Sequence, residues 1–260
     1  LVLASIRYEL PKLRYIGGDR TTNGIVAPGM EEIIDIPASH ATSYQKLDQA
    51  YHFFVQGNFR AACDVLPDPF SPFSSLLPQA VIDTARLILP WAEFYERWDR
   101  LDYRGADKVE FRVNHAIPSH VEKRWSRFVV SDTQRNWVRT LASGLPEDCD
   151  QKADRLLMLA CDLLTNGERR LRDAHFEDAI IRSYRVLELM GQYRLFMHGL
   201  DSGNLPPEHP AVQRLMKRLE KKKSTSFGMN KDGNYTAGRE QVCRLLTELG
   251  DAYGKKLFEI

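Results

Sequence analysis

The first 37 residues of the chain constrain its fold most, because they predict strands whereas the rest of the chain predicts helices. Apolar residues at 13–16 lead into the turn Gly17-Gly18, and a second apolar segment at 25–26 follows another glycine. Short apolar segments between glycine turns are typical of β-strands. A two-stranded hairpin is at best marginally stable alone in water. We therefore expect residues 1–37 to be the closing strands of a larger sheet, most of which lies outside this sequence.

The composition predicts a soluble, cytoplasmic globular protein. Hydrophobic residues make up 43% and charged residues 27% of the chain, and the mean hydropathy is −0.40. No apolar run approaches the roughly 18 residues that a membrane span needs, and no secretory signal is expected. Lys and Arg total 36 against 35 for Asp and Glu, so any nucleic-acid site must come from a local patch.

The cysteines and histidines predict neither a disulfide framework nor a metal site. The four cysteines form no C-x-x-C pair, and the seven histidines show no spacing such as H-E-x-x-H. Scattered cysteines of this kind are typical of reduced, buried thiols in a cytoplasmic protein. We therefore expect no metal and no cofactor.

From residue 38 onward, apolar residues recur at helical spacing, which predicts a mainly α protein. The best-defined helix begins at Phe176, and its apolar residues through Gly191 occupy one face. Pro90 is expected to kink or split the helix that contains it. The expected helices cover 41–56, 59–66, 79–100, 119–142, 150–173, the segment from Phe176, 211–223 and 236–258, with loops at 67–78, 201–210 and 224–235.

Two short segments resemble each other. Gly57-Asn58-Phe59 and Ala174-His175-Phe176 both read as a small or polar turn followed by an aromatic residue at the start of a helix. This pattern is typical of helical hairpins of the tetratricopeptide (TPR) type. Two copies do not make a repeat array, so we expect single TPR-like hairpins.

The turn Gly17-Gly18-Asp19-Arg20 is a candidate ligand-binding site. Backbone amides at a glycine turn can approach an anion closely, and an arginine adds charge-assisted hydrogen bonds. Gly17, Gly18 and Arg20 are the candidate residues. The alternative is an ordinary hairpin turn with a surface arginine.

Arginine and histidine in close sequence spacing suggest acid–base chemistry on RNA. Some metal-independent ribonucleases use an arginine to stabilise charge on the phosphate and a histidine as the general acid or base, with four to six residues between the two. Arg170 and His175 satisfy this spacing, but we expect His175 to be a turn residue. Arg194 and His198 are one residue short, and a cation at a helix C-terminus is the alternative role of His198.

Two further charged groups lie on predicted helices. Arg185 and Glu188 are three residues apart, so we expect an ion pair, partly buried on an otherwise apolar helix, that fixes the helix register. A basic stripe on another helix is a candidate track for an RNA backbone, and a solvated face is its alternative. The stripe consists of Arg214, Lys217, Arg218 and Lys221.

Two segments resemble a known family. The N-terminal segment contains the runs RYIGGDR (14–20), NGIV (23–26) and GME (29–31), which resemble the closing strands of a CARF domain. CARF is the Rossmann-like sensor domain of type III CRISPR systems. The runs FEDA (176–179) and RSYRVLEL (182–189) resemble the helical region of CRISPR-associated CARF–HEPN proteins.

The resemblance implies a domain organisation and an activity. Residues 1–37 would close a CARF-like sensor sheet that binds cyclic oligoadenylate, and residues 38–260 would form a helical effector domain. HEPN domains pair in a homodimer and form a composite, metal-independent ribonuclease site for single-stranded RNA. Each protomer supplies an arginine and a histidine, and attack by the RNA 2′-OH gives a cyclic phosphate.

The chain departs from the family pattern at its C-terminal end. The Arg-x4-6-His motif of HEPN domains sits on a late helix, whereas the last helix expected here ends near Ile260 without it. We expect the motif either to lie beyond Ile260 or to be lost. Arg194 and His198 are therefore the candidate catalytic pair within this sequence.

Two other functions remain open. The first is a non-catalytic, TPR-like protein-interaction module attached to a ligand-sensing domain. The second is a transcriptional regulator with a helix-turn-helix. A Pro-rich loop, and not a short helix and turn, precedes the basic helix at 211–223, which counts against the regulator.

Overall fold

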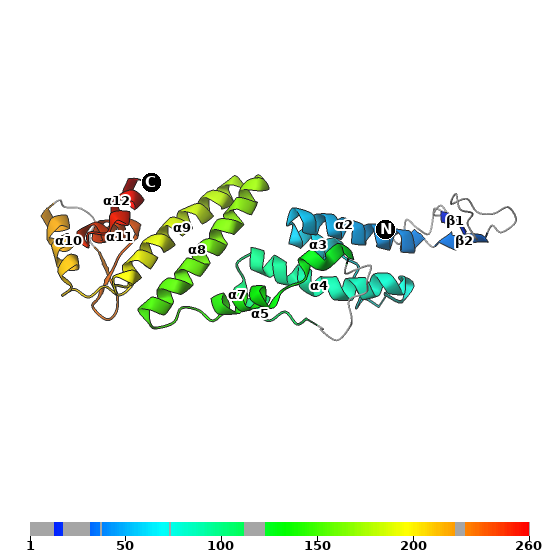
Figure 1. Ribbon diagram of the computed structural model, residues 1–260, viewed down its shortest axis with the longest axis horizontal. Coiled ribbons are helices and arrows are strands. Elements are labelled where there is room, and N and C mark those ends of the chain that lie inside the picture. Colours follow the sequence, from blue (N-terminus) through cyan, green and yellow to red (C-terminus); the bar gives the residue numbers. More distant parts are fainter. Residues whose placement is uncertain are drawn as a thin grey trace. The chain divides into compact units, whose positions relative to one another are not determined.

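The structure is a computed structural model, and it describes residues 13–17, 32–36, 38–72, 74–111, 123–221 and 227–259. The chain divides into two compact units, Leu1–Arg135 and Asn136–Ile260, which we call the N-terminal and C-terminal units. Most described residues are helical, which confirms the predicted mainly α fold (Figure 1). The domain boundary predicted after residue 37 stays a prediction.

The N-terminal unit begins with a β-hairpin. Strands β1 (Leu13–Gly17) and β2 (Glu32–Ile36) pair in antiparallel fashion, and Gly17 lies opposite Glu32. The strand predicted at 13–16 is therefore confirmed. The second apolar segment, at 25–26, lies outside the described residues.

Aromatic side chains dominate the core of the helical part of the N-terminal unit. Phe54 is 2% exposed, and its ring centroid lies 5.2 Å from that of Trp125 and 5.6 Å from that of Phe59. Both contacts are edge-to-face, a geometry that stabilises aromatic pairs beyond the burial of their surface. The elements are α2 (Ala38–Gln56), α3 (Phe59–Val65), η1 (Ser74–Leu76), α4 (Gln79–Asp99), α5 (Tyr103–Asp107), η2 (Ser126–Phe128) and α7 (Asp132–Ala142), which spans the boundary between the units.

The structure corrects two helix predictions in this part of the chain. Pro90 lies inside α4, which continues through it, so the expected split does not occur, whereas the expected kink stays a prediction. The helix expected over 119–142 is interrupted between η2 and α7. The cause is a capping box: the backbone N–H of Gln134 donates to Oγ of Ser131 at 3.2 Å, and Oε1 of Gln134 accepts from the backbone N–H of Ser131 at 2.9 Å.

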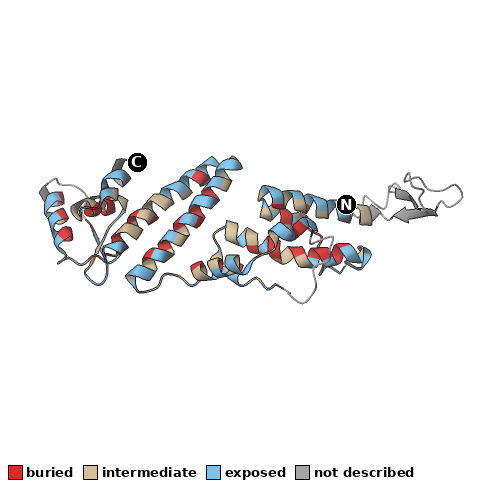
Figure 2. Cartoon of the chain, viewed as in Figure 1, coloured by how far each residue is buried: buried red, intermediate tan, exposed pale blue. Residues whose placement is uncertain are grey.

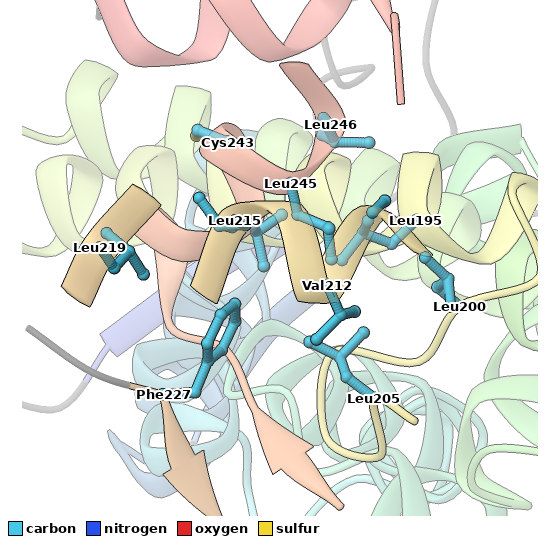
Figure 3. Close-up of a cluster of buried hydrophobic side chains, with 12 residues drawn as sticks. Leu195, Leu200, Leu205, Val212, Leu215, Leu219, Phe227, Cys243, Leu245 and Leu246 are labelled. Carbon is cyan, nitrogen blue, oxygen red and sulfur yellow. The ribbon is translucent and has the colours of Figure 1, made fainter. Parts of the chain in front are cut away.

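The C-terminal unit is a long helical hairpin followed by a smaller helical cluster. Its hydrophobic core joins the end of α9 to α10 and α11 through Leu195, Leu215 and Leu245, each at most 1% exposed (Figure 3). A short hairpin, β3–β4, lies in and beside the segment expected to be only a polar loop. The elements are α8 (Cys149–Arg172), α9 (Phe176–Met197), α10 (Pro210–Lys221), β3 (Gly228–Met229), β4 (Tyr235–Thr236), α11 (Arg239–Glu248) and α12 (Ala252–Glu259).

The two echoing segments adopt the same turn, as the sequence predicts. Gly57 and Ala174 have φ angles of 76° and 61°, in the left-handed region. The residues after them, Asn58 and His175, donate their backbone N–H to carbonyls of the preceding helix at 2.9 and 2.8 Å. These are the features of a Schellman motif. Helices α3 and α9 begin at the next residue, so each turn joins two helices without a spacer.

The apolar face predicted for α9 is only partly buried, because Ala179 and Gly191 are buried whereas its larger N-terminal side chains are exposed. Phe176, Ile180 and Tyr184 of this face are 59%, 68% and 48% exposed, whereas Leu189 and Leu195, which lie outside it, are at most 1% exposed (Figure 2). The reason is that α11 and α12 pack against α9 near its C-terminal end, while its N-terminal half contacts α8. An exposed apolar surface therefore remains on α9.

The three cysteines whose side chains the structure describes are free, but they are not all buried as expected. Cys243 is buried, Cys63 is partly buried and Cys161 is exposed. Burial, together with the nearby carboxylates of Glu96, Glu93 and Asp64, raises the pKa of Cys63 to about 12. The side chain of Cys149 lies outside the described part of the structure.

Candidate functional site

The candidate site forms where the turn between α11 and α12 meets the last turn of α9. Gly250 adopts a φ of 76° after α11, and the backbone N–H of Asp251 donates to the carbonyl of Leu246 at 2.9 Å. Helix α12 begins at the next residue. This tight turn places the Asp251 side chain in the interior, where it has no exposed surface.

Asp251 brings the predicted pair Arg194 and His198 together. Its Oδ2 accepts hydrogen bonds from Nε and Nη2 of Arg194 at 3.1 and 2.7 Å. The same oxygen lies 2.9 Å from Nε2 of His198. Its Oδ1 accepts from the backbone N–H of Tyr253 at 2.8 Å. Arg194 and His198 are four residues apart, so they lie on the same side of α9.

The environment of Asp251 favours the ionised carboxylate. Burial raises the pKa of this carboxyl group, but hydrogen bonds from His198, Arg194 and the Tyr253 backbone N–H outweigh burial and hold the pKa below its ordinary value. An ionised carboxylate only accepts hydrogen bonds, so Nε2 of His198 must carry the shared proton. In neutral His198, Nδ1 is then the nitrogen left to accept a proton.

Arg194 and His198 remain accessible although both contact a buried group. Their side chains are 37% and 32% exposed. The arrangement resembles other His–carboxylate pairs, in which the carboxylate fixes the tautomer and orientation of the imidazole. It can supply a proton acceptor and a cation within the same small area.

In the other candidate pair, Arg170 and His175, the histidine has a structural role. His175 is the N-cap residue of α9, although its side chain makes no capping hydrogen bond, and its backbone N–H donates to the carbonyl of Arg170. The prediction of a turn residue is confirmed. The predicted pair Arg185–Glu188 also forms, at 2.6 Å, but it lies near the surface with Arg185 51% exposed.

The predicted basic stripe on α10 is partly neutralised. Nη1 of Arg218 lies 2.6 Å from Oε1 of Glu248, and Nε of Arg214 lies 3.8 Å from Oε2 of the same residue. Lys217 is exposed. The side chain of Lys221 lies outside the described part of the structure.

The predicted ligand-binding turn is largely outside the described residues. Gly17 is the last residue of β1, whereas Gly18 and Arg20 are not described. The structure therefore leaves this site as a prediction.

A pocket of about 520 Å³ lies beside α9 but does not include the candidate pair. Gln192 and Phe196 line it, together with Lys152 and Asp201, whose Nζ and Oδ2 atoms are 3.1 Å apart. Among the described residues, no group of three or more His, Cys, Asp and Glu side chains is placed to hold a metal ion. Within the same ranges, no helix has the length and apolar character of a membrane span.

Comparison with known families adds a match over most of the C-terminal unit. Residues 148–260 match the Csm6 HEPN domain. This match confirms the resemblance to CRISPR-associated HEPN proteins over that part of the chain. The matched HEPN segment contains α8 to α12, and hence Arg194, His198 and Asp251. A search of curated proteins finds no match to the chain.

The sequence did not predict the two acidic residues, Asp251 and Glu248, that bind the candidate arginines and His198. Asp251 is 57 residues from Arg194, and Glu248 is 34 residues from Arg214. A local signal did exist, because Gly250-Asp251 is a helix-ending glycine followed by a helix-capping residue type. It predicts a turn between helices, but not which side chains meet there.

Proposed function

We propose that the protein is a CRISPR-associated endoribonuclease that cuts single-stranded RNA and is activated by cyclic oligoadenylate. The observation that carries the proposal is the HEPN match over residues 148–260, which includes an arginine and a histidine held together by a buried carboxylate. HEPN proteins of this kind act on RNA without a metal, as the resemblance implies. Arg194 and His198 are the proposed catalytic residues.

The proposed reaction uses the two side chains in different roles. Nδ1 of His198 takes the proton from a ribose 2′-OH, and the oxygen attacks the adjacent phosphorus in line. The bond from phosphorus to the 5′ oxygen breaks, leaving a cyclic phosphate, and an imidazolium returns a proton to the leaving oxygen. The guanidinium of Arg194 stabilises the additional negative charge on the phosphate oxygens.

A homodimer is part of the proposal. The resemblance implies that two HEPN domains share one composite site, and the exposed face of α9 offers an apolar surface for pairing. Phe176, Ile180, Ile181 and Tyr184 on this helix are 59%, 68%, 65% and 48% exposed. Contiguous exposed apolar side chains are typical of interaction surfaces.

The proposed activator site is the turn after β1. Gly17, Gly18 and Arg20 would contact a phosphate of cyclic oligoadenylate, with the β1–β2 hairpin as the closing edge of the sensor sheet. This part rests on the sequence resemblance and on the pairing of the two strands.

A second candidate function has an observation in its favour. Asp251 engages both Arg194 and His198. In this alternative the network is purely structural and joins α9 to the turn between α11 and α12. In that case the helical part is a non-catalytic, TPR-like interaction module attached to a ligand-sensing domain.

One experiment separates the two functions. Full-length protein is incubated with a fluorogenic single-stranded RNA in EDTA, with cyclic tetra-adenylate, cyclic hexa-adenylate or neither. We expect cleavage with one activator only and its loss in His198→Asn. His175→Gln is the matched control and should cleave as the unsubstituted protein does, because His175 is a turn residue.

The outcomes decide between the functions as follows. Activator binding without RNA cleavage would favour the interaction module. Cleavage that survives in a folded His198→Asn variant would place the catalytic histidine elsewhere. Circular dichroism and thermal melting of each variant distinguish a lost catalytic group from a lost fold.

A further inference from the structure

Glu248 occupies an unusual place for a carboxylate. It is the last residue of α11, where the negative end of the helix dipole disfavours an acidic side chain. Its side chain is also only 8% exposed. A carboxylate in such a position needs compensating cations, and both come from α10.

Arg214 and Arg218 supply this compensation in a particular arrangement. Nη1 of Arg218 binds Oε1 of Glu248 at 2.6 Å, Nε of Arg214 lies 3.8 Å from Oε2, and Nη2 of Arg214 donates to the Glu248 backbone carbonyl at 3.3 Å. Each carboxylate oxygen therefore faces a different guanidinium. The glutamate is buried, whereas the side chains of Arg214 and Arg218 are 57% and 58% exposed to solvent.

A neighbouring ion pair has the opposite arrangement. Nη2 of Arg244 lies 2.6 Å from Oε1 of Glu240 on α11, but here the arginine is the less exposed partner, at 27%, and the glutamate is 48% exposed. That pair presents its carboxylate to solvent. The Glu248 cluster instead presents two guanidinium groups.

We propose that Glu248 is a positioning residue that holds Arg214 and Arg218 as a paired phosphate-binding site for the RNA backbone. The inference rests on the proposed function, since it names how an RNA substrate contacts this domain. Guanidinium groups that are held in place lose less conformational entropy when they bind a phosphate. Residues four apart on a helix have Cβ atoms about 5–6 Å apart, so the two groups lie side by side.

The geometry leaves donors free for a phosphate. Glu248 engages Nη1 of Arg218, and its carboxylate and carbonyl face Nε and Nη2 of Arg214. The remaining guanidinium N–H groups belong to side chains that are 57% and 58% exposed. Lys217 lies between the two arginines in sequence and is exposed, so it adds charge without a fixed geometry.

The test compares two substitutions that change net charge equally. Full-length protein binds a fluorescein-labelled, 2′-O-methylated single-stranded RNA, which cannot be cleaved, and affinity is measured by fluorescence anisotropy. Glu248→Gln and Glu240→Gln each remove one negative charge from α11. Charge alone would tighten RNA binding in both variants. Positioning predicts that Glu248→Gln weakens binding, by roughly threefold to tenfold, while Glu240→Gln does not.

A double variant keeps Glu248 and the net charge unchanged. Arg214→Lys and Arg218→Lys together retain two cations but remove the planar guanidinium groups. We expect a similar loss of affinity, and this loss would support the inference even if Glu248→Gln did not fold. Folding of each variant is checked by circular dichroism.

The outcomes distinguish this inference from the proposed function. No RNA binding by the unsubstituted protein would overturn the RNA substrate and the inference together. RNA binding that Glu248→Gln tightens, or that the double lysine variant leaves unchanged, would overturn the positioning role alone.

Discussion

Asp251 carries a negative charge inside the C-terminal unit, and its neighbours decide at which pH this charge persists. Because its folded-state pKa is lowered, ionised Asp251 stabilises the fold above the unfolded-state value, and this stabilisation is lost as the pH falls through the folded-state pKa. Removing one partner of a buried ion pair leaves the other charges uncompensated. The contribution of Asp251 should therefore be large at neutral pH and small in acid.

We expect Asp251→Asn to lower the free energy of unfolding by about 2 kcal/mol at neutral pH, because charge-assisted hydrogen bonds to Arg194 and His198 are weakened. The loss is modest because Arg194 and His198 are partly exposed, so solvent screens their interaction with the carboxylate. Urea unfolding followed by circular dichroism measures the difference from the unsubstituted protein. The difference should shrink toward about pH 3, below the ordinary carboxyl pKa of about 4. An equal difference at both pH values would contradict the assigned cause.

The sequence predicted the two basic members of the cluster formed by Arg194, His198 and Asp251, but not the carboxylate. The spacing of Arg194 and His198 on one helix was enough to place them on the same side of α9, and the structure brings both to one carboxylate oxygen. Asp251 itself could not be predicted, because its position depends on how α11 and α12 fold back on α9. Helical periodicity describes each helix but not its partner.

At the scale of the elements, the turn at Ala174 is strained. An L-residue in the left-handed region carries a steric cost of about 1–2 kcal/mol, which glycine avoids. Ala174 has a φ of 61°, whereas the equivalent position in the α2–α3 turn is Gly57. The left-handed position of the turn is therefore occupied by a favourable glycine between α2 and α3 and by an unfavourable alanine between α8 and α9.

We expect Ala174→Gly to raise the free energy of unfolding by about 1 kcal/mol. The control is Ala179→Gly, the same chemical change on α9 at a buried helical position, which should lower it by at least about 1 kcal/mol. Urea denaturation curves of the two variants measure the opposite signs. Equal destabilisation by both substitutions would show that the left-handed conformation of Ala174 is not a cost.

The sequence predicted the helices better than their faces and interruptions. The turns at Gly57 and Ala174 follow from local residue types, and the structure confirms both. The capping box of Ser131 and Gln134 was also a local signal, but the strong apolar periodicity of 119–142 concealed it. The exposure of Phe176 and Ile180 depends on which helices pack against the N-terminal half of α9, and local sequence patterns do not contain this tertiary information.

At the scale of the whole molecule, the two units have cores of different character. Aromatic rings around Phe54 and Trp125 fill the core of the N-terminal unit, whereas leucines such as Leu215 and Leu245 fill that of the C-terminal unit. The HEPN match begins at residue 148, close to the start of the C-terminal unit. The proposed ribonuclease groups and the proposed phosphate site both lie in this unit, so the proposed pairing with a second copy would bear directly on the proposed activity.

The proposed homodimer predicts the effect of a charge on the exposed face of α9. Ile180 is 68% exposed, and its burial against a second copy would contribute about 1.5–3 kcal/mol. Ile180→Glu replaces this contribution with a desolvation cost, so the dimer dissociation constant should rise at least roughly tenfold. Leu76→Glu is the matched control, since Leu76 is 62% exposed in the N-terminal unit. Sedimentation velocity over a concentration series measures both. If Leu76→Glu dissociates the dimer and Ile180→Glu does not, the pairing surface lies elsewhere, and the shared HEPN site on α9 must be abandoned.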